Sequence, residues 1–269
     1  MEKLITLDNV SKSYDGKYVL DHITLDLYKA QSIAFTGHNG CGKSTLLKLI
    51  AGLIRSSSGK IDHHEKIRFG FVPEKFPGMN ISMKDYLYSI AEIENVDHSE
   101  ADSLVRDFFL ESMINTKLNE LSKGSLQKVG VIQALIGKRD VILLDEPLSG
   151  QDAASQDVFI EKINELRGKG VTVLMSCHER RLIDELTDRE YTINNGKLYC
   201  KEGGEDYLYK IFVKKNESLT AWPDMTDHGN KRMLTGSFAI SKCIPVYHLF
   251  FRKRNRLKFQ IHNKKPMLS

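Results

Sequence analysis

The chain has 269 residues, of which 41% are hydrophobic and 28% are charged. These values are typical of a globular protein and exclude a collagen-like, mucin-like or largely disordered chain. The net charge of +4 is unevenly distributed, because residues 214–269 carry 12 Lys and Arg but only 3 Asp and Glu. That segment has a charge of +9, which leaves −5 on residues 1–213. We therefore expect an acidic body and a basic tail.

Neither a membrane span nor a disulfide framework is predicted. A membrane-spanning helix needs about 20 apolar residues, and the longest candidate, Ile244–Phe251, contains Pro245 and His248. The first residues show no signal-like apolar run. The four cysteines form no C-x-x-C pair, which predicts free thiols in a reducing cytoplasm. We expect a cytoplasmic protein that reaches a membrane only through a partner.

Strand patterns dominate the N-terminal part. Alternation of apolar and polar residues predicts strands over Leu4–Val10 and Val19–Leu27, joined by a turn at residues 14–17. A short buried strand over Ser32–Thr36 leads into a glycine-rich loop. A helical stretch follows and stops at Gly52.

Strands and helices alternate from residue 67 onward, and residues 82–134 have helical periodicity. The last strand pair is predicted as a hairpin around Asn195-Gly196. The strands are expected over Ile67–Val72, Val141–Leu144 and Val171–Met175, and the helices over Asp152–Arg167 and Glu179–Leu186. This alternation indicates an α/β fold around a parallel sheet.

Residues Gly37–Ser44 match the pattern G-x-x-x-x-G-K-[ST] in full. Glycines allow backbone N–H groups to approach phosphate oxygens, and the following helix adds the positive end of its dipole. In such a loop Lys43 reaches the β- and γ-phosphates, and the Ser44 hydroxyl binds Mg²⁺. An ordinary glycine-rich turn is disfavoured, because a strand precedes the loop and a helix follows it. We expect a nucleotide site here.

Two acids suit the same site. The apolar run Val141–Leu144 ends in Asp145 and Glu146, so a buried strand delivers both carboxylates at its C-terminal end. Asp145 would hold Mg²⁺, directly or through water. Glu146 could polarise the water that attacks the γ-phosphate. An acidic pair at the end of a strand is usually only a solvated strand end. Together with a phosphate loop, the pair predicts hydrolysis of the γ-phosphate.

Between these two motifs stands Leu121-Ser122-Lys123-Gly124-Ser125. In this order the motifs resemble those of ATP-binding-cassette (ABC) ATPases, over about residues 3–200, although the family usually has Gly at position 123 and Gln at 125. The resemblance implies an α/β fold: a P-loop NTPase core with an N-terminal antiparallel β subdomain and a helical subdomain inserted at about residues 76–135. It implies an ATPase domain over residues 1–205, followed by a basic extension over 206–269.

The resemblance also implies site residues. Tyr14 would stack on adenine, Ser122 and Gly124 would donate to a γ-phosphate held by a partner subunit, and His178 would contact the γ-phosphate. Residues Ser149–Asp152 resemble the family's dimer-contact loop, and Asp152 could equally be a helix N-cap. The implied nucleotide-binding residues are Tyr14, Gly37, His38, Asn39, Gly40, Cys41, Gly42, Lys43, Ser44, Thr45, Ser122, Gly124 and Asp152. The catalytic residues are Glu146, His178 and Lys43, and the metal ligands are Ser44, Glu74 and Asp145.

Residue 74 departs from the family pattern. After the strand ending at Val72 the family usually has Gln, whereas this chain has Pro73-Glu74. Glu74 can still bind Mg²⁺ through oxygen but adds negative charge beside the phosphates. Pro73-Glu74 and Lys123 resemble a branch of ABC ATPases paired with export-type (ABC-2-like) permeases.

The predicted function is ATP·Mg²⁺ binding and hydrolysis that drives a separate membrane permease. Two subunits, expected as a homodimer, would close head to tail around ATP. The permease would hold this dimer at the inner face of the membrane. The alternative is a permease-free ABC ATPase in assembly, translation or nucleic-acid work. A GTPase would need Asn-Lys-x-Asp, and the nearest string, Asn230–Met233, lacks the Asp.

Three features outside these motifs have plainer interpretations. The pair His63-His64 is expected in a loop, since no third metal ligand stands at a suitable spacing. Cys41 is expected to be a small filler. The basic run Arg252–Lys258 leaves three readings open: a solvated end, contact with anionic lipid or the permease, and contact with nucleic acid, for which no specific signal is present.

Overall fold

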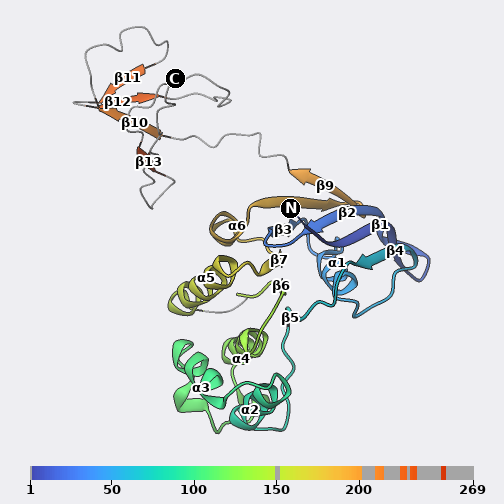
Figure 1. Ribbon diagram of the computed structural model, residues 1–269, viewed down its shortest axis with the longest axis vertical. Helices are drawn as coiled ribbons and strands as arrows, with labels where there is room; N and C mark the ends of the chain where they lie inside the picture. Colours follow the sequence, from blue (N-terminus) through green and yellow to red (C-terminus); the bar gives the residue numbers. More distant parts are fainter. Residues whose placement is uncertain are drawn as a thin grey trace, which may run out of the picture. The chain divides into compact units, whose positions relative to one another are not determined.

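The computed structural model describes residues 2–148 and 152–201, and beyond them the backbone of four short strands (Figure 1). The chain divides into two compact units, Met1–Gly203 and Gly204–Ser269. The predicted dimer-contact loop is therefore only partly seen, because residues 149–151 lie outside the described residues.

A six-stranded sheet forms the centre of the first unit, in the order β5-β6-β7-β3-β8-β9. All neighbours are parallel except the hairpin β8–β9, which turns at Asn195-Gly196 as predicted. The strands are β3 (Ser32–Thr36), β5 (Phe69–Val72), β6 (Val141–Asp145), β7 (Thr172–Ser176), β8 (Arg189–Asn194) and β9 (Lys197–Lys201). The α/β expectation is confirmed.

Strand β6 is buried on both faces, as its continuous apolar run requires. Val141 and Leu143 pack into one hydrophobic cluster, and Ile142 and Leu144 pack into the other. The carboxyl end of β6 is therefore fixed between the two hydrophobic clusters. This fixes the position of Asp145, the last residue of β6, and of the backbone that follows it.

An antiparallel sheet covers one of these clusters, in the order β2-β1-β4. Its strands are β1 (Lys3–Tyr14), β2 (Lys17–Tyr28) and β4 (Ser58–His63). The turn between β1 and β2 has positive φ at Asp15 and Gly16, which suits a tight hairpin. Strand β4 was not predicted, and the loop interpretation of His63 is wrong: His63 ends β4, and its Nε2 lies 2.8 Å from the carbonyl oxygen of Ile50.

The helical subdomain is a set of short helices rather than one long helical stretch. It contains α2 (Met83–Ile93), α3 (His98–Asp107), the 3₁₀ turns Glu111–Met113 and Leu118–Glu120, and α4 (Lys123–Leu135). Asn95 and Phe109, both with positive φ, follow α2 and α3 where helical periodicity alone showed no break. Ser82, Asp97 and Ser122 cap the three α-helices. Figure 1 shows α2, α3 and α4 gathered at one end of this unit.

Three more helices complete the first unit. Helix α1 (Lys43–Ile50) follows β3, while α5 (Ala153–Gly168) and α6 (Arg180–Leu186) flank β7 in the chain. The side chain of Asp152 accepts from the Ser155 N–H and caps α5, which confirms the N-cap interpretation. Among the described residues, no helix is both long and apolar enough to cross a membrane.

In the second unit, four antiparallel strands lie in the order β11-β12-β10-β13. They span Lys210–Lys214 (β10), Met225–His228 (β11), Lys231–Leu234 (β12) and Phe250–Arg252 (β13). Asp227 and His228 thus lie in a strand. The rest of the basic run, residues 253–258, and Cys243 lie outside the described residues, while Cys41, Cys177 and Cys200 are free thiols.

Candidate functional site

The predicted phosphate-binding loop connects the carboxyl end of β3 to the start of α1. Gly37 has φ of +138°, and a Cβ there would lie 2.5 Å from the carbonyl oxygen of Ile193, so no side chain fits. Gly42 has φ of +111° and immediately precedes α1. Between them, His38, Asn39 and Gly40 are exposed at the tip of the loop. The loop is therefore a glycine cradle open to a ligand, at the positive end of a helix.

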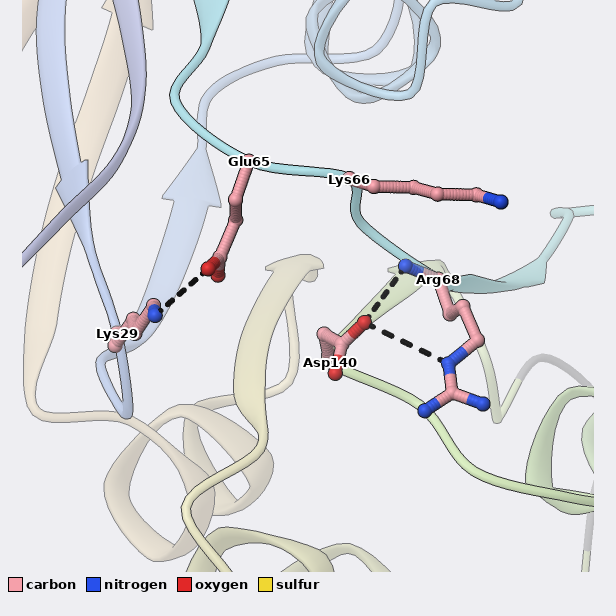
Figure 2. A pocket seen from close by; sticks show the side chains of 5 residues that line it. All are labelled: Lys29, Glu65, Lys66, Arg68 and Asp140. Carbon is pink, nitrogen blue, oxygen red and sulfur yellow. Dashed lines mark hydrogen bonds and ion pairs between the residues drawn. The ribbon is translucent and has the colours of Figure 1, made fainter.

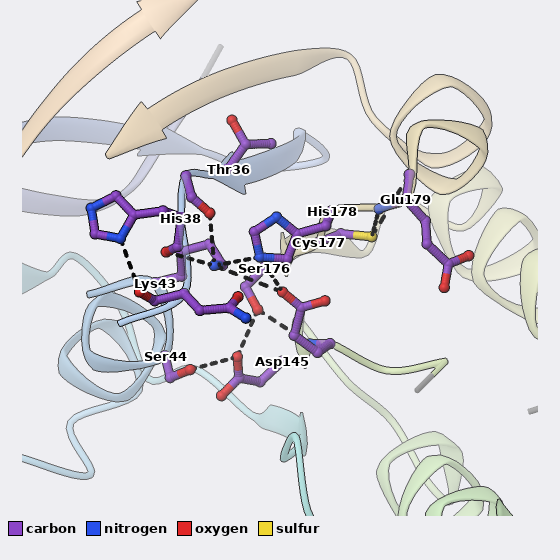
Figure 3. A network of polar contacts seen from close by, with 12 residues as sticks. Thr36, His38, Lys43, Ser44, Asp145, Ser176, Cys177, His178 and Glu179 are labelled. Atoms are coloured by element: carbon purple, nitrogen blue, oxygen red, sulfur yellow. Dashed lines mark hydrogen bonds and ion pairs between the residues drawn. The ribbon is translucent and has the colours of Figure 1, made fainter. Parts of the chain in front are cut away.

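Lys43 is the cation of this loop and is almost fully buried, with 6% of its surface exposed. Its Nζ donates to the carbonyl oxygen of Gly37 at 3.0 Å and to Nε2 of His178 at 2.8 Å. The same Nζ lies 3.8 Å from Oε1 of Glu146. Figure 3 shows Lys43 of the predicted phosphate loop and His178, which follows β7, pointing toward one another.

Asp145 ends β6 and is buried, with 2% of its surface exposed. Its Oδ1 accepts two hydrogen bonds, from Oγ of Ser44 at 2.8 Å and from Oγ of Ser176 at 2.6 Å (Figure 3). Ser44 and Asp145 therefore present oxygen atoms to one another, which is the donor chemistry that Mg²⁺ prefers. The predicted pair of metal ligands is brought together.

Glu146 follows Asp145 in a strained backbone conformation, with φ of +47°. Its Oε1 is buried without a hydrogen bond, although Nε2 of His178 lies 3.2 Å away. Burial raises the pKa of this carboxyl; Lys43 opposes the rise, and Asp145 and Glu74 add to it. A carboxylate with a raised pKa and a free lone pair is equipped to accept a proton.

His178 lies two residues beyond β7, with its ring nitrogen on Lys43. Burial first, and the charge of Lys43 second, lower the pKa of its imidazole, so the neutral form is favoured. Because the Lys43 ammonium can only donate, Nε2 must accept, and we assign the imidazole proton to Nδ1.

Glu74 lies two residues after the end of β5, and its charge acts on the carboxyl of Glu146. Val72, the last residue of β5, pairs with Leu144 of β6, so Glu74 and Glu146 each follow this pair by two residues. Glu74 is exposed, and the Pro73 carbonyl beside it accepts from Nε2 of Gln127 at 2.8 Å. Helix α4, which carries Gln127, is therefore tied to the segment that holds Glu74.

Tyr14 ends β1 with 49% of its surface exposed. The Lys12 ammonium lies 4.9 Å from the centre of the Tyr14 ring and donates to the Arg55 carbonyl at 2.8 Å. The ring is thus held in place by a cation–π contact while part of its surface remains open to solvent.

The motif Leu121–Ser125 lies at the start of α4. The hydroxyl of Ser122 accepts from the Ser125 N–H at 3.1 Å and caps the helix. In the described part of the chain, no hydrogen bond or ion pair connects this motif with the phosphate loop. Within one subunit, then, the structure does not bring Ser122 and Gly124 to the other site residues.

A separate charged pocket lies at the opposite edge of the central sheet (Figure 2). It is lined by Lys29, Glu65, Lys66, Arg68 and Asp140, which precede strands β3, β5 and β6 in the chain. Lys29 pairs with Glu65 at 2.9 Å, and the Arg68 backbone N–H donates to Asp140 at 2.8 Å. Both acids of the pocket are thus paired with basic residues that line it.

Residues 20–149 match the family model described as ABC transporter. The uncharacterized ABC transporter ATP-binding protein MJ1023 of Methanocaldococcus jannaschii is 33% identical over 218 residues, covering 78% of this chain and 82% of the relative. The chain belongs to the ABC transporter ATP-binding proteins. The zinc import ATP-binding protein ZnuC of Pseudomonas putida is 29% identical over 236 residues, covering 85% of this ABC ATPase and 91% of the relative.

Solved structures agree with the fold of this ABC ATPase. An ATP-binding subunit of an ABC transporter superposes with a TM-score of 0.67 at 26% identity, covering 72% of this chain and 88% of that one. A dimeric ATP-binding cassette bound to ADP and Pi superposes with a TM-score of 0.66 at 21% identity, covering 72% and 96%. The P-loop NTPase fold is confirmed, and the protein is an ATPase subunit of a transporter.

Sequence reasoning missed three polar side chains around the site of this ABC ATPase: Lys12, Lys128 and Ser176. Lys128 is buried on α4, and its Nζ lies 3.0 Å from Oδ2 of Asp152. Each missed residue acts on a predicted one, namely Tyr14, Asp152 and Asp145. Only Lys12 left a signal in the sequence, since residues two apart on a strand share a face.

Proposed function

We propose that ATP binds to the phosphate loop Gly37–Thr45 of this ABC ATPase, with its base on Tyr14, and is hydrolysed there. The observation that carries the proposal is the convergence of Lys43, Asp145, Glu146 and His178 from three separate segments onto one edge of the sheet. We assign the ATPase domain to residues 1–205, with the helical subdomain at about 76–135, and treat residues 206–269 as a separate basic extension.

Mg²⁺ would be held by Ser44 and Asp145, with Glu74 as a further oxygen ligand. The 2.8 Å contact between the Ser44 hydroxyl and the Asp145 carboxylate supports this donor set. When bound, Mg²⁺ neutralises charge on the phosphate oxygens. Glu74 brings a negative charge where the family usually has an amide, so a higher Mg²⁺ requirement is expected.

Glu146 would act as the general base. Its buried, unbonded Oε1 accepts a proton from water while the water oxygen bonds to the γ-phosphorus. The bond from that phosphorus to the bridging oxygen breaks, and ADP leaves. His178, neutral and bonded to Lys43 in this structure, would turn to the γ-phosphate and orient the water.

A second subunit would complete the site. Ser122 and Gly124 make no contact with the phosphate loop of their own chain in the described residues, although helix N-termini are suited to phosphate. We propose a head-to-tail homodimer in which each Leu121–Ser125 motif meets the partner's nucleotide. Asp152 would lie near that interface, next to residues 149–151.

The helical subdomain would meet a separate permease and hold the subunit at the cytoplasmic face of the membrane, and the basic extension would lie near the anionic lipid surface. Two observations bear on the direction of transport, and they point in opposite directions. Pro73-Glu74 and Lys123 favour export, whereas the relatives with a stated cargo, at 28–29% identity, are zinc import proteins.

The test is Glu146→Gln, measured for ATP turnover and for ATP-dependent dimerisation by size-exclusion chromatography. We expect turnover to fall at least about 100-fold, as removal of a general base predicts, while ATP still produces a dimer. Glu179→Gln, a nearby exposed carboxylate, is the matched control and should keep turnover. Persistent turnover without an ATP-dependent dimer would contradict the mechanism. Failure to recover a polytopic partner from membranes would favour the permease-free alternative.

A further inference from the structure

Ser176 contacts both acids of the candidate site. It is fully buried at the end of β7 and pairs in register with Asp145 of β6. Its Oγ donates to Oδ1 of Asp145 at 2.6 Å. The same oxygen accepts from the backbone N–H of Glu146 at 3.2 Å.

The direction of these two hydrogen bonds is determined by chemistry. An N–H can only donate and an ionised carboxylate can only accept, so the hydroxyl hydrogen of Ser176 points to Asp145 and a lone pair faces Glu146. One hydroxyl therefore holds the proposed metal ligand by its side chain and the proposed base by its backbone.

The contact with Glu146 acts where the backbone is strained. A non-glycine residue at φ of +47° lies in the left-handed region, which has a conformational cost for an L side chain. The Glu146 N–H donates to two oxygen atoms of Ser176, the carbonyl oxygen at 3.1 Å and the hydroxyl oxygen at 3.2 Å. These hydrogen bonds offset the conformational cost. The turn that aims the Glu146 carboxylate is thereby pinned to β7.

The contact with Asp145 acts where the metal ligand must not rotate. Oδ1 of Asp145 has two side-chain donors among the described residues, Ser44 and Ser176. Ser44 is itself a proposed Mg²⁺ ligand, so its contact with Asp145 is exchanged when the ion binds. Ser176 then remains to orient the carboxylate.

We propose that Ser176 is a positioning residue that orients Asp145 for Mg²⁺ and Glu146 for the attacking water. The inference rests on the proposed function, because it presumes ATP·Mg²⁺ at this site. It goes beyond that function by adding a residue that touches neither nucleotide nor metal. Partners of metal ligands of this kind typically change metal affinity by about 10- to 100-fold when removed.

The experiment compares Ser176→Ala, Ser176→Thr and Ser176→Val in the full chain. Thr keeps the hydroxyl and Val replaces it with a methyl group of equal size, so the steric cost of the larger side chain cancels between them. The readout is the Mg²⁺ concentration that gives half of the Mg²⁺-dependent increase in melting temperature at saturating ATP, with ATP in EDTA as the baseline.

We expect Ala and Val to raise this Mg²⁺ midpoint about 10- to 100-fold, and Thr to stay within about 3-fold of wild type. The baseline shift by ATP in EDTA should persist in every variant, because the phosphate loop is intact. If Val and Thr share one midpoint, Ser176 only fills the core and the proposal is overturned; should Ala fail to fold, the Thr and Val pair decides alone. Absence of any ATP-induced shift in the wild type would instead contradict the proposed function.

Discussion

The buried ammonium of Lys128 lies 3.0 Å from a carboxylate oxygen of Asp152 and joins helix α4 to the cap of helix α5. Lys128 stands on the helix that begins with the Leu121–Ser125 motif, and Asp152 directly follows residues 149–151. The Ser155 backbone N–H first, and Lys128 second, hold the pKa of the Asp152 carboxyl far below its usual range. The two segments proposed to meet a partner subunit are thus linked within one chain.

This pair predicts an asymmetric double-mutant cycle. Asp152→Asn keeps an N-cap side chain but removes the carboxylate charge beside the buried Lys128 ammonium, which is left with the more distant Phe108 carbonyl oxygen at 3.5 Å. We expect this change to lower the free energy of unfolding by about 1–3 kcal/mol. Lys128→Met removes the charge together with its desolvation cost and should change stability by less than about 1 kcal/mol. In urea unfolding, the double variant should recover most of the free energy of unfolding that Asp152→Asn loses. If the changes of the two single variants simply add up in the double variant, the two residues are not coupled.

Glu146 predicts a pH-dependent stability difference. Burial raises its pKa above the ordinary 4.5, so the folded state binds the proton more tightly than the unfolded state. The wild type therefore loses stability as pH rises from the ordinary pKa through the raised one. Glu146→Gln should melt about 2–4 °C higher than wild type near neutral pH, and the gap should close near pH 4. A wild type that melts higher at neutral pH would show that attraction to Lys43 outweighs burial.

Tyr14 predicts that nucleotide affinity depends on the base. Stacking on an aromatic ring contributes about 1–3 kcal/mol per base, so Tyr14→Ala should weaken ATP binding by about 5- to 150-fold. Tyr14→Phe keeps the ring and should bind ATP normally. Lys12→Met, which loses the cation at 4.9 Å from the ring, should weaken it by about 2- to 5-fold. Tripolyphosphate, measured by competition, should bind all variants equally. If Tyr14→Ala weakened tripolyphosphate binding as much as ATP binding, Tyr14 would support the structure of the site rather than contact the base.

The phosphate loop predicts unequal costs for two glycine substitutions. Gly37→Ala forces a Cβ to 2.5 Å from the Ile193 carbonyl oxygen, and the backbone must shift. Gly40→Ala meets nothing within 4 Å and has only the cost of its φ of +79°, about 1–2 kcal/mol. Thermal unfolding without nucleotide should therefore show at least twice the loss for Gly37→Ala. Equal losses would mean that β8 yields to the new methyl group.

Local patterns determined the nucleotide chemistry of this protein. The spacing Gly37–Ser44, the apolar run into Asp145 and the position of Ser122 are each written in consecutive residues, because a phosphate loop, a buried strand end and a helix cap are local structures. For the same reason the hairpins at residues 15–16 and 195–196 were predictable from their turn residues. Strand β4 was missed because its exposed residues show no apolar alternation.

Tertiary structure alone decided which side chains hold the site in place. Ser176 meets Asp145, 31 residues away in the chain, through parallel strand pairing. Lys128 of α4 meets Asp152, the N-cap of α5, through an ion pair. Neither contact has a periodicity or a motif, because each depends on register between distant segments. The residues predicted from the sequence are those that would touch the ligand. The residues that only the fold revealed hold those ligand-contacting residues in position, and local sequence patterns do not encode such long-range contacts.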